Sequence, residues 1–323
     1  MRRGRYEFKE REIARRLLRQ GDRVIELGSG MGVVSLTMAG LIGSEALRCF
    51  EANPRIIELA RRNAQINGLP VVFRNQIASP RVQAAETPSI DFYVLNSFEA
   101  SSTRQVSPSQ KSISVTTTPL EDEIASHSAN VLVFDIEGFE TEIVQKTDLS
   151  SIERLFFEIH PKILGMSICV GLIDELEAQG LVLRQDLVFG DVLAFDRVSV
   201  PSAISGSTLF KTLCDMETKS RDHQWQTAYD LAVSVETEIA ENAYAQFSVA
   251  QIEKALGIPS LKRAELSAEL GSHDFQLFSY LAALYVQAGN RRKAQQATDR
   301  LAELFPQNLD LDTWRSRVTC IPT

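Results

Sequence analysis

The stretch Val24–Leu36, VIELGSGMGVVSL, contains the pattern that decides the fold. An apolar run carries one acidic residue, Glu26, and is followed by glycine at every second position, at Gly28, Gly30 and Gly32. Glycine has no Cβ, so it accepts positive φ angles and lets a ligand approach the main chain closely. We therefore predict a strand, a glycine turn that faces a small molecule, and then a helix.

Apolar strand-like runs alternate with helical patterns from Gly21 to about Arg197, which is typical of a parallel sheet with crossover helices. The runs are RVIEL, ALRCFE, VVFRNQ, NVLVFDI and RLFFEIH. LVLRQDLVF and DVLAFD, with Gly-Asp between them, predict a hairpin that closes the sheet with an antiparallel pair. The predicted fold is a Rossmann-like α/β sheet, mostly parallel with one antiparallel strand. Between Pro80 and Leu120 two alternating runs, rich in Ser and Thr, predict an inserted hairpin or lid.

Residues 198–207 have the Pro, Gly and Ser content of a linker, and residues 208–323 are predicted to form a small all-α domain. The segment 278–306 resembles a tetratricopeptide repeat. The matching positions are Leu281, Ala282, Tyr285, Gly289, Ala294 and Pro306, with Phe278 in place of the usual tryptophan. Thr298 and Leu301 depart from that pattern. One repeat cannot bury its own apolar face, so it must pack on other helices, on the first domain or on another subunit.

The bulk composition indicates a soluble, intracellular protein. The net charge of −8 disfavours binding that depends on phosphate contacts, so we expect no nucleic-acid partner. The four cysteines lie far apart without metal-binding spacing, which favours reduced thiols and a cytoplasmic location. The chain has no apolar run long enough to cross a bilayer. The basic N-terminal segment, interrupted by glutamates, is interpreted as a solvated helix face.

Glu26 determines which ligand suits the glycine turn. A carboxylate at the end of this strand would repel a pyrophosphate, and the spacing G-x-G-x-G departs from the dinucleotide fingerprint. S-adenosylmethionine has no phosphate and carries an ammonium and a sulfonium, so Glu26 can attract it. We assign Glu26, Gly28, Ser29, Gly30 and Gly32 to cofactor binding; the alternative is a ligand-free strand-to-helix turn.

Glu51 ends the next strand, 23 residues after Gly28. A carboxylate about 20 residues beyond such a loop is placed to bind the two hydroxyls of a ribose. The alternative is a solvated charge at a strand end. Ala78, just beyond the third expected strand, is also assigned to the cofactor site.

The next expected strand ends in DIEG, which contains Asp135, Glu137 and Gly138. Two carboxylates there could orient a substrate hydroxyl, act as a base or help to bind a divalent cation. Alternatively, Asp135 caps the following helix, and Glu137 and Glu140 lie in its first turn. We assign Asp135 to both cofactor binding and catalysis, Glu137 to catalysis, and no residue to a metal.

The fifth expected strand ends in FFEIHP, which contains Glu158 and His160. A histidine close to a carboxylate is a candidate general base at neutral pH. The alternative is a hydrogen-bonded histidine before a proline turn. We assign His160 to catalysis because it should lie at the same edge of the sheet as Glu26 and Glu51.

Residues 1–197 resemble an FkbM-type S-adenosylmethionine-dependent methyltransferase. The resemblance is carried by YEFKEREIARRLLRQGDRVIELGSGMG, FEANPRIIELARRNAQING, TTPLEDEI, VFDIEGFETEIV and FFEIHP. It implies a class I methyltransferase domain over residues 1–197, with Asp135, Glu137 and Gly138 in its D-x-E-G motif. Glu26, Ser29 and Gly30 replace the usual Asp, Ala and Asn, and Val133 stands where a lysine is frequent.

The function predicted from the sequence is methyl transfer from S-adenosylmethionine. The FkbM resemblance implies O-methylation of a small-molecule, sugar or glycan-like acceptor, and Ser101, Ser102 and Thr103 are predicted to line the acceptor site. The C-terminal helices predict a protein partner or self-association. Two alternatives are a non-catalytic scaffold with a degenerate methyltransferase domain, and a nicotinamide dehydrogenase.

Overall fold

The computed structural model describes residues 6–94, 111–197, 204–306 and 311–321 of the 323. The chain divides into two compact units. The α/β unit comprises Lys9–Leu187 and Asp191–Lys211, and the helical unit comprises Met1–Phe8, Val188–Gly190 and Thr212–Thr323. Each unit is described separately below.

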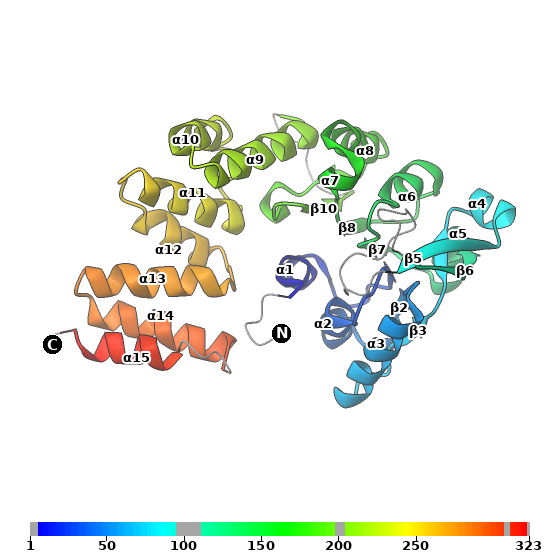
Figure 1. The fold of residues 1–323 in the computed structure, drawn as a ribbon, viewed down its shortest axis with the longest axis horizontal. Helices are drawn as coiled ribbons and strands as arrows, with labels where there is room; N and C mark the ends of the chain where they lie inside the picture. Colours follow the sequence, from blue (N-terminus) through cyan, green and yellow to red (C-terminus); the bar gives the residue numbers. More distant parts are fainter. Residues whose placement is uncertain (1–5, 95–110, 198–203, 307–310, 322–323) are drawn as a thin grey trace. The chain divides into compact units, whose positions relative to one another are not determined.

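A seven-stranded sheet forms the centre of the α/β unit (Figure 1). Its strands, in spatial order, are β3 (Val72–Arg74), β2 (Leu47–Phe50), β1 (Val24–Leu27), β7 (Val131–Phe134), β8 (Arg154–Glu158), β10 (Val192–Asp196) and β9 (Val182–Leu183). The first five are parallel, and β10 is antiparallel to both of its neighbours. The predicted Rossmann-like sheet with an antiparallel strand is therefore confirmed.

The expected hairpin between β9 and β10 is longer than predicted. A short 3-10 helix, η2 (Gln185–Leu187), lies between the two strands, so Gly190 and Asp191 do not form the whole connection. The VVFRNQ run is also strand only over β3. Asn75 leaves the strand direction there because its side-chain amide donates to the carbonyls of Glu51 and Ala52.

Helices cover the sheet on two sides, with α1, α2 and α3 on one side and α6 and α8 on the other (Figure 1). The helices of this part of the chain are α1 (Phe8–Leu17), α2 (Val33–Ile42), η1 (Ser44–Ala46), α3 (Pro54–Ile66), α4 (Arg81–Glu86), α5 (Leu120–His127), α6 (Glu140–Lys146), α7 (Pro161–Leu164) and α8 (Met166–Ala178). Pro54 occupies the first turn of α3 and Asn53 caps it, as such a start requires. One face of α1 is buried, including Glu12, Ile13 and Ala14, so the interpretation of this segment as a solvated helix face is wrong for that face.

Three strands in the part of the chain between β3 and α5 form a second sheet. Its strands are β4 (Ile77–Ser79), β5 (Ser89–Val94) and β6 (Lys111–Pro119), in the order β4-β6-β5. β5 and β6 pair antiparallel from Ser89↔Thr116 to Val94↔Lys111, which confirms the inserted hairpin. Ser101, Ser102 and Thr103 lie outside the described residues.

The core of the α/β unit is built from strands that are buried on both faces. Every residue of β1 and β7 is buried, as expected for continuous apolar runs. Phe134, Phe157 and Phe195 come from three adjacent strands and stack, with ring centroids 4.5 Å and 5.9 Å apart. This packing fixes the lateral order of β7, β8 and β10, and therefore the positions of the loops that follow them.

A buried ion pair joins the amino ends of the strands. The guanidinium of Arg154, at the start of β8, donates to both carboxylate oxygens of Asp22 at 2.6 Å and 2.9 Å. Both side chains are 3% exposed. Arg154 also donates to the carbonyl of Leu17 at the end of α1, and Asn130 donates to Asp22. This network therefore ties α1, β1 and β8 together at the edge opposite to the glycine turn.

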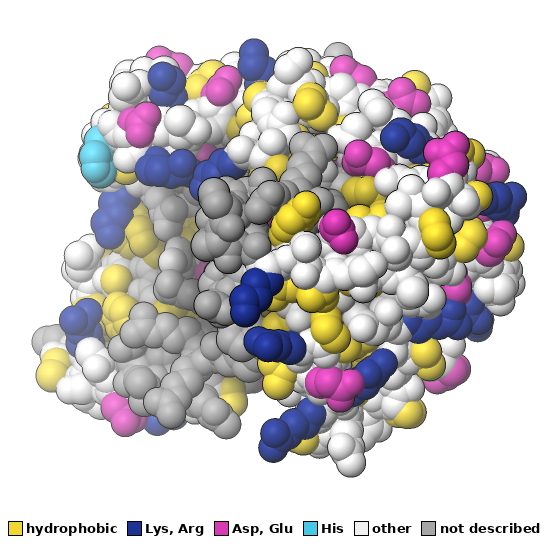
Figure 2. All heavy atoms as spheres, turned by 45° about the vertical axis from the view of Figure 1, so that its right-hand side comes forward, with side chains coloured by type: hydrophobic (Ala, Val, Ile, Leu, Met, Phe, Trp, Pro, Cys, Tyr) yellow, Lys and Arg dark blue, Asp and Glu magenta, His cyan; other side chains and the backbone are white. Residues whose placement is uncertain are grey.

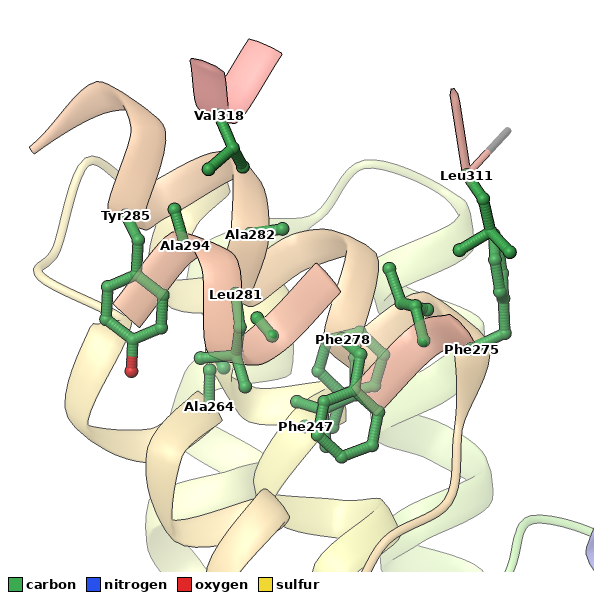
Figure 3. Packing of buried hydrophobic residues seen from close by; sticks show 14 of the residues in the cluster. Phe247, Ala264, Phe275, Phe278, Leu281, Ala282, Tyr285, Ala294, Leu311 and Val318 are labelled. Carbon is green, nitrogen blue, oxygen red and sulfur yellow. The ribbon is translucent and has the colours of Figure 1, made fainter. Parts of the chain in front are cut away.

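The helical unit continues to near the end of the chain. Its helices are α10 (Trp225–Ser234), α11 (Ala243–Ala255), α12 (Leu261–Glu269), α13 (Phe275–Gln287), α14 (Arg291–Leu304) and α15 (Leu311–Thr319), and α9 (Gly206–Arg221) precedes them. α9 begins inside the segment that was predicted to be a linker. Figure 3 shows apolar side chains from α11, α12, α13, α14 and α15 in one cluster. Leu281, Ala282, Tyr285 and Ala294 belong to it, so these repeat-like positions serve packing.

Three bulk expectations can be compared with the described residues. The four cysteines form no disulfide within the described part of the chain. None of the helices in the described part of the chain is long and apolar enough to cross a membrane. Acidic and basic side chains are interspersed on the face shown in Figure 2, so the net charge of −8 does not describe each part of the surface.

Candidate functional site

The glycine turn follows β1 and folds over the end of β2. The backbone N–H groups of Gly28 and Ser29 both donate to the carbonyl of Phe50, at 2.9 Å and 3.1 Å. Gly28, Gly30 and Gly32 all have positive φ. An added Cβ at Gly28 would lie 1.8 Å from the carbonyl oxygen of Asp135. Only glycine fits this position, because the turn passes directly against the end of β7.

Glu51 lies directly beneath this turn. Its two carboxylate oxygens accept hydrogen bonds from Gly30 N at 2.9 Å and from Asn53 N at 2.7 Å. Burial raises its pKa to about 7, against the lowering effect of these hydrogen bonds; the nearby carboxylate of Glu26 also raises it. Glu51 is 7% exposed, so its carboxyl group lies in the protein interior, where ionisation costs free energy.

Glu26 is buried below the turn. It is 3% exposed, and the hydroxyl of Ser35 in α2 donates to its carboxylate. Cys49 is its register partner in β2, and its thiol contributes a second hydrogen bond. Burial raises the pKa of Glu26 to about 7 despite both contacts. Glu26 therefore acts on the site as a buried carboxyl group that can hold a proton near neutral pH, and not as a surface group.

The raised pKa of Glu26 predicts a specific pH dependence of stability. A carboxyl group whose pKa rises from 4.5 to about 7 on folding stabilises the protein fully below pH 4.5, and this contribution is lost as the pH rises through 7. Glu26→Gln removes the cost of ionisation. We therefore expect it to gain stability relative to the parent between pH 5 and pH 8, by at most about 3 kcal/mol.

Urea unfolding at pH 5 and pH 8 measures this effect. Glu58→Gln in α3 is the control, because Glu58 is 68% exposed at its side chain and should give the same small difference at both pH values. An unchanged difference between Glu26→Gln and the parent across this pH range would contradict the buried, proton-binding role.

The loop after β7 places two carboxylates at the next strand end. Asp135 continues from β7, and its N–H donates to the carbonyl of Leu27 in β1. Glu137 has φ of 48°, a left-handed conformation that is uncommon outside glycine, and Gly138 follows with φ of 100°. α6 begins only at Glu140, after Phe139. The capping role considered for Asp135 is therefore wrong; Glu140 does lie in the first turn, but Glu137 precedes it.

His160 completes a cluster with these residues. It follows β8, and its Nε2 lies 3.5 Å from Asp135 Oδ1 and 3.5 Å from Glu137 Oε2. Its Nδ1 lies 2.5 Å from Glu140 Oε1. The carboxylate partner of the ring is thus Glu140 and not the neighbouring Glu158. We call Asp135, Glu137 and His160 the acidic cluster.

The acidic cluster carries strongly shifted pKa values. Burial raises the pKa of Asp135 well above 3.8, and the charges of Glu158 and Glu137 add to the effect. Burial lowers the pKa of His160. The hydrogen bond to Glu140 and the charge of Asp135 together outweigh this effect and raise the pKa to about 9. The imidazole is therefore protonated at neutral pH, and it has no free lone pair for the general-base role that its sequence position predicts.

Ala78, which the sequence assigned to the cofactor site, belongs to the α/β unit. It is buried in β4 of the second sheet, where its register partner is Thr118. Two residues that the sequence patterns did not assign do touch the site: Ser35 through Glu26, and Asn75 through the backbone that follows β2. Both signals are weak in sequence, since each is a single polar residue with no distinctive spacing.

The strand ends thus bring two groups of residues to one edge of the sheet. β1 lies between β2 and β7, with Leu27 paired to Phe50 on one side and Phe134 on the other. The glycine turn and Glu51 lie on the β2 side, and the acidic cluster lies on the β7 side. An open α/β sheet binds ligands at this carboxyl edge.

Comparison with known proteins agrees with this geometry. The family described as the methyltransferase small domain matches residues 11–115. The chain is 35% identical over 52 residues to the ribosomal protein L11 methyltransferase of Bacillus velezensis. That match spans 16% of this chain and 16% of the relative. Together with the strand order, these findings support a class I methyltransferase fold for this part of the chain. The predicted cofactor, S-adenosylmethionine, agrees with that class.

Solved structures with similarity to the chain include three methyltransferases. Ribosomal protein L11 methylase of Lactobacillus delbrueckii subsp. bulgaricus has a TM-score of 0.35 at 9% identity, covering 58% of this chain and 75% of its own. The 23S rRNA methyltransferase ErmE has a TM-score of 0.32 at 15% identity, covering 64% and 73%. TrmK of M. capricolum, bound to S-adenosyl-homocysteine, has a TM-score of 0.34 at 9% identity, covering 98% of both chains.

These comparisons correct one expectation. We expected no nucleic-acid partner and a small-molecule or glycan-like acceptor, whereas proteins similar to this chain are named for a ribosomal protein or for 23S rRNA as the substrate. The exclusion was wrong because it used the net charge of the whole chain. Lys and Arg side chains lie among acidic ones on the surface, and local contacts depend on that distribution (Figure 2).

Proposed function

We propose that the α/β unit binds S-adenosylmethionine and directs its methyl group to an acceptor at the acidic cluster. The observation that carries this proposal is Glu51: a buried carboxylate that ends β2 and accepts from Gly30 of the glycine turn. A carboxylate in this position suits a ribose diol, and it lies beside main chain that only glycine can form.

The residues of the turn fit this cofactor chemically. Ser29 is 2% exposed, and its hydroxyl has no hydrogen-bond partner among the residues that the structure describes, so it can donate to a ligand. Glu26 and Glu51 place two carboxyl groups near a ligand that carries positive charge. The bound cofactor would supply a methyl group activated by a sulfonium. We retain Gly28, Gly32, Ala78 and Asp135 as further cofactor-site residues.

The acidic cluster would act on the acceptor. Asp135, Glu137 and His160 are the proposed catalytic residues, because they lie together at the end of β7 and β8 and remain partly exposed. Their contribution is to hold the nucleophile in line with the methyl group. Positioning of this kind can supply on the order of 7–11 kcal/mol of barrier reduction.

Titration with S-adenosylhomocysteine tests the cofactor proposal. We expect the full-length protein to bind it in calorimetry, and Glu51→Gln to weaken binding about 10–100-fold, because an amide replaces a charged acceptor. Glu58→Gln is the matched control in the same unit and should bind like the parent. Absence of binding by the parent protein would favour the scaffold alternative, and binding of NADH in its place would favour the dehydrogenase.

Acceptor chemistry belongs to the same proposal. The prediction that the acceptor atom is oxygen rests on the FkbM resemblance. The relatives described above are named for a ribosomal protein or for rRNA as the acceptor. Incubation with methyl-labelled cofactor and separated protein and RNA fractions identifies the acceptor class. The chemical stability of the transferred label then distinguishes an oxygen-linked from a nitrogen-linked methyl group.

The tetratricopeptide resemblance concerns the helical unit alone. Its support is the close packing of α13 on α14, in which Leu281, Ala282 and Ala294 are buried. We retain it as a prediction about that unit and assign it no part in methyl transfer.

A further inference from the structure

The acidic cluster has the geometry of a metal site. One ligand atom each from Asp135, Glu137 and His160 lies within 4.8 Å of the other two. His160 Nε2 is 3.5 Å from the nearest oxygen of each carboxylate. Two ligands that are each about 2.1 Å from an ion lie roughly 3.0–3.4 Å apart, so small side-chain rotations bring these atoms into coordination distance.

Glu140 gives a second reason to assign a ligand here. Its side chain is 0% exposed, and its Oε2 has no hydrogen-bond partner, while its Oε1 contacts His160 Nδ1. Asp135 Oδ1 is likewise buried without a hydrogen-bond partner. Leaving buried carboxylate oxygens unsatisfied is costly unless a positive charge is present nearby.

The contact with Glu140 also sets the state of the imidazole. Because Nδ1–H donates to Glu140, Nε2 is the ring nitrogen directed at Asp135 and Glu137, and an ion bound there would displace the proton on Nε2. Metal-binding histidines in proteins are oriented in this way by a carboxylate behind the ring. Glu140 is therefore a positioning residue, because it acts through His160.

The surrounding charge is strongly negative. Glu158 and Glu10 add acidic charge around Asp135, and Asp191 adds acidic charge around Glu158. Lys9 is close to this group, but it pairs with Asp191 at 2.6 Å.

We propose that Asp135, Glu137 and His160 ligate one divalent first-row transition-metal cation, with Glu140 orienting the imidazole. The single nitrogen ligand beside two carboxylates favours ions such as Mn²⁺ or Zn²⁺ over Mg²⁺ and Ca²⁺, which prefer oxygen. The side chains of Asp135 and Glu137 are 36% and 29% exposed, so one side of the ion stays open. An acceptor can reach the ion from that side.

This inference rests on the proposed function for its role, although the ion site itself does not require it. A divalent cation lowers the pKa of a coordinated hydroxyl or water and orients it. The cluster would then activate the acceptor through the ion, and His160 would serve as a neutral ligand and not as a general base.

Titration with Mn²⁺ alone tests the site. The full-length protein is stripped with EDTA, dialysed and titrated with Mn²⁺, with bound and free ion measured by electron paramagnetic resonance. We expect one site per chain and weaker binding of Mg²⁺. Asp135→Asn and His160→Gln should lower Mn²⁺ affinity by at least about 100-fold, and Glu140→Gln by about 10–100-fold.

Asp122→Asn is the matched control, because this exposed carboxylate pairs with Arg81 at the surface, and its substitution should leave Mn²⁺ binding unchanged. If a cluster variant does not fold, Mn²⁺ broadening of the histidine resonances in the parent protein decides. His160 should broaden more strongly than His127, which bonds near the opposite ends of the strands.

Stoichiometric binding that survives His160→Gln, or no Mn²⁺ binding by the parent, would overturn the inference. Titration of the EDTA-treated protein with S-adenosylhomocysteine separates the two proposals. Cofactor binding without Mn²⁺ binding leaves the proposed function in place and removes the ion. Mn²⁺ binding without cofactor binding does the reverse.

Discussion

Gly28→Ala should lower the affinity for S-adenosylhomocysteine by at least about 100-fold. The new Cβ would lie 1.8 Å from the carbonyl oxygen of Asp135 and 3.3 Å from Ile136 Cγ2, and neither the end of β7 nor the turn can move without breaking backbone hydrogen bonds. A shift of the turn also takes Gly30 N away from Glu51. Calorimetric titration measures the loss, and it corresponds to about 2.7 kcal/mol or more.

Gly68→Ala separates this clash from simple backbone strain. Gly68 follows α3 with φ of 66°, and an added Cβ there meets nothing within 4 Å. Its substitution should cost stability of about 1 kcal/mol, as a left-handed alanine does, without changing cofactor affinity. Equal loss of affinity in both variants would show that the approach of Gly28 to Asp135 does not determine the site.

Arg154→Ala should lower the free energy of unfolding by about 3–5 kcal/mol. The substitution leaves the Asp22 carboxylate buried without its cation, at a position where both side chains are 3% exposed. It also removes the donor to Leu17 at the end of α1. Urea unfolding, followed by circular dichroism, measures the change.

Arg81→Ala is the surface counterpart. Arg81 and Asp122 form an ion pair in which the side chains are 60% and 62% exposed, so its loss should cost less than about 1 kcal/mol. The double substitution Asp22→Asn with Arg154→Met should recover part of the loss, because it removes both buried charges together. A loss for Arg154→Ala as small as that for Arg81→Ala would contradict the structural role of the buried pair.

The sequence predicted that the glycine turn, Glu26 and Glu51 lie at one edge of the sheet, because that information is local. The glycine spacing, Glu26 and Glu51 lie on consecutive strands, and the parallel arrangement brings consecutive strand ends to one edge. The burial of β1 and β7 follows from their uninterrupted apolar residues. Strand burial and the common edge of the strand ends can be predicted from sequence periodicity, because neither depends on the details of side-chain contacts between distant segments.

The acidic cluster was only partly predictable. His160 pairs with Glu140, 20 residues earlier, and this contact depends on how the loop after β7 meets the end of β8. The neighbouring Glu158 was the closer carboxylate in sequence but not the hydrogen-bond partner. The conformation of Glu137 likewise follows from the turn before α6 and not from residue type, since glutamate seldom adopts positive φ. Side-chain pairing between loops of this kind has no periodic signature.

The thiol of Cys49 lies inside the sheet opposite Glu26 and is 0% exposed, and burial raises its pKa well above 9.0. Since the protonated, enclosed sulfur is unreactive, an alkylating reagent modifies it only when this part of the core opens. The rate of its modification therefore reports how often the floor of the glycine turn opens. The native Cys49 can therefore measure the rate of local opening beneath the site without an added label.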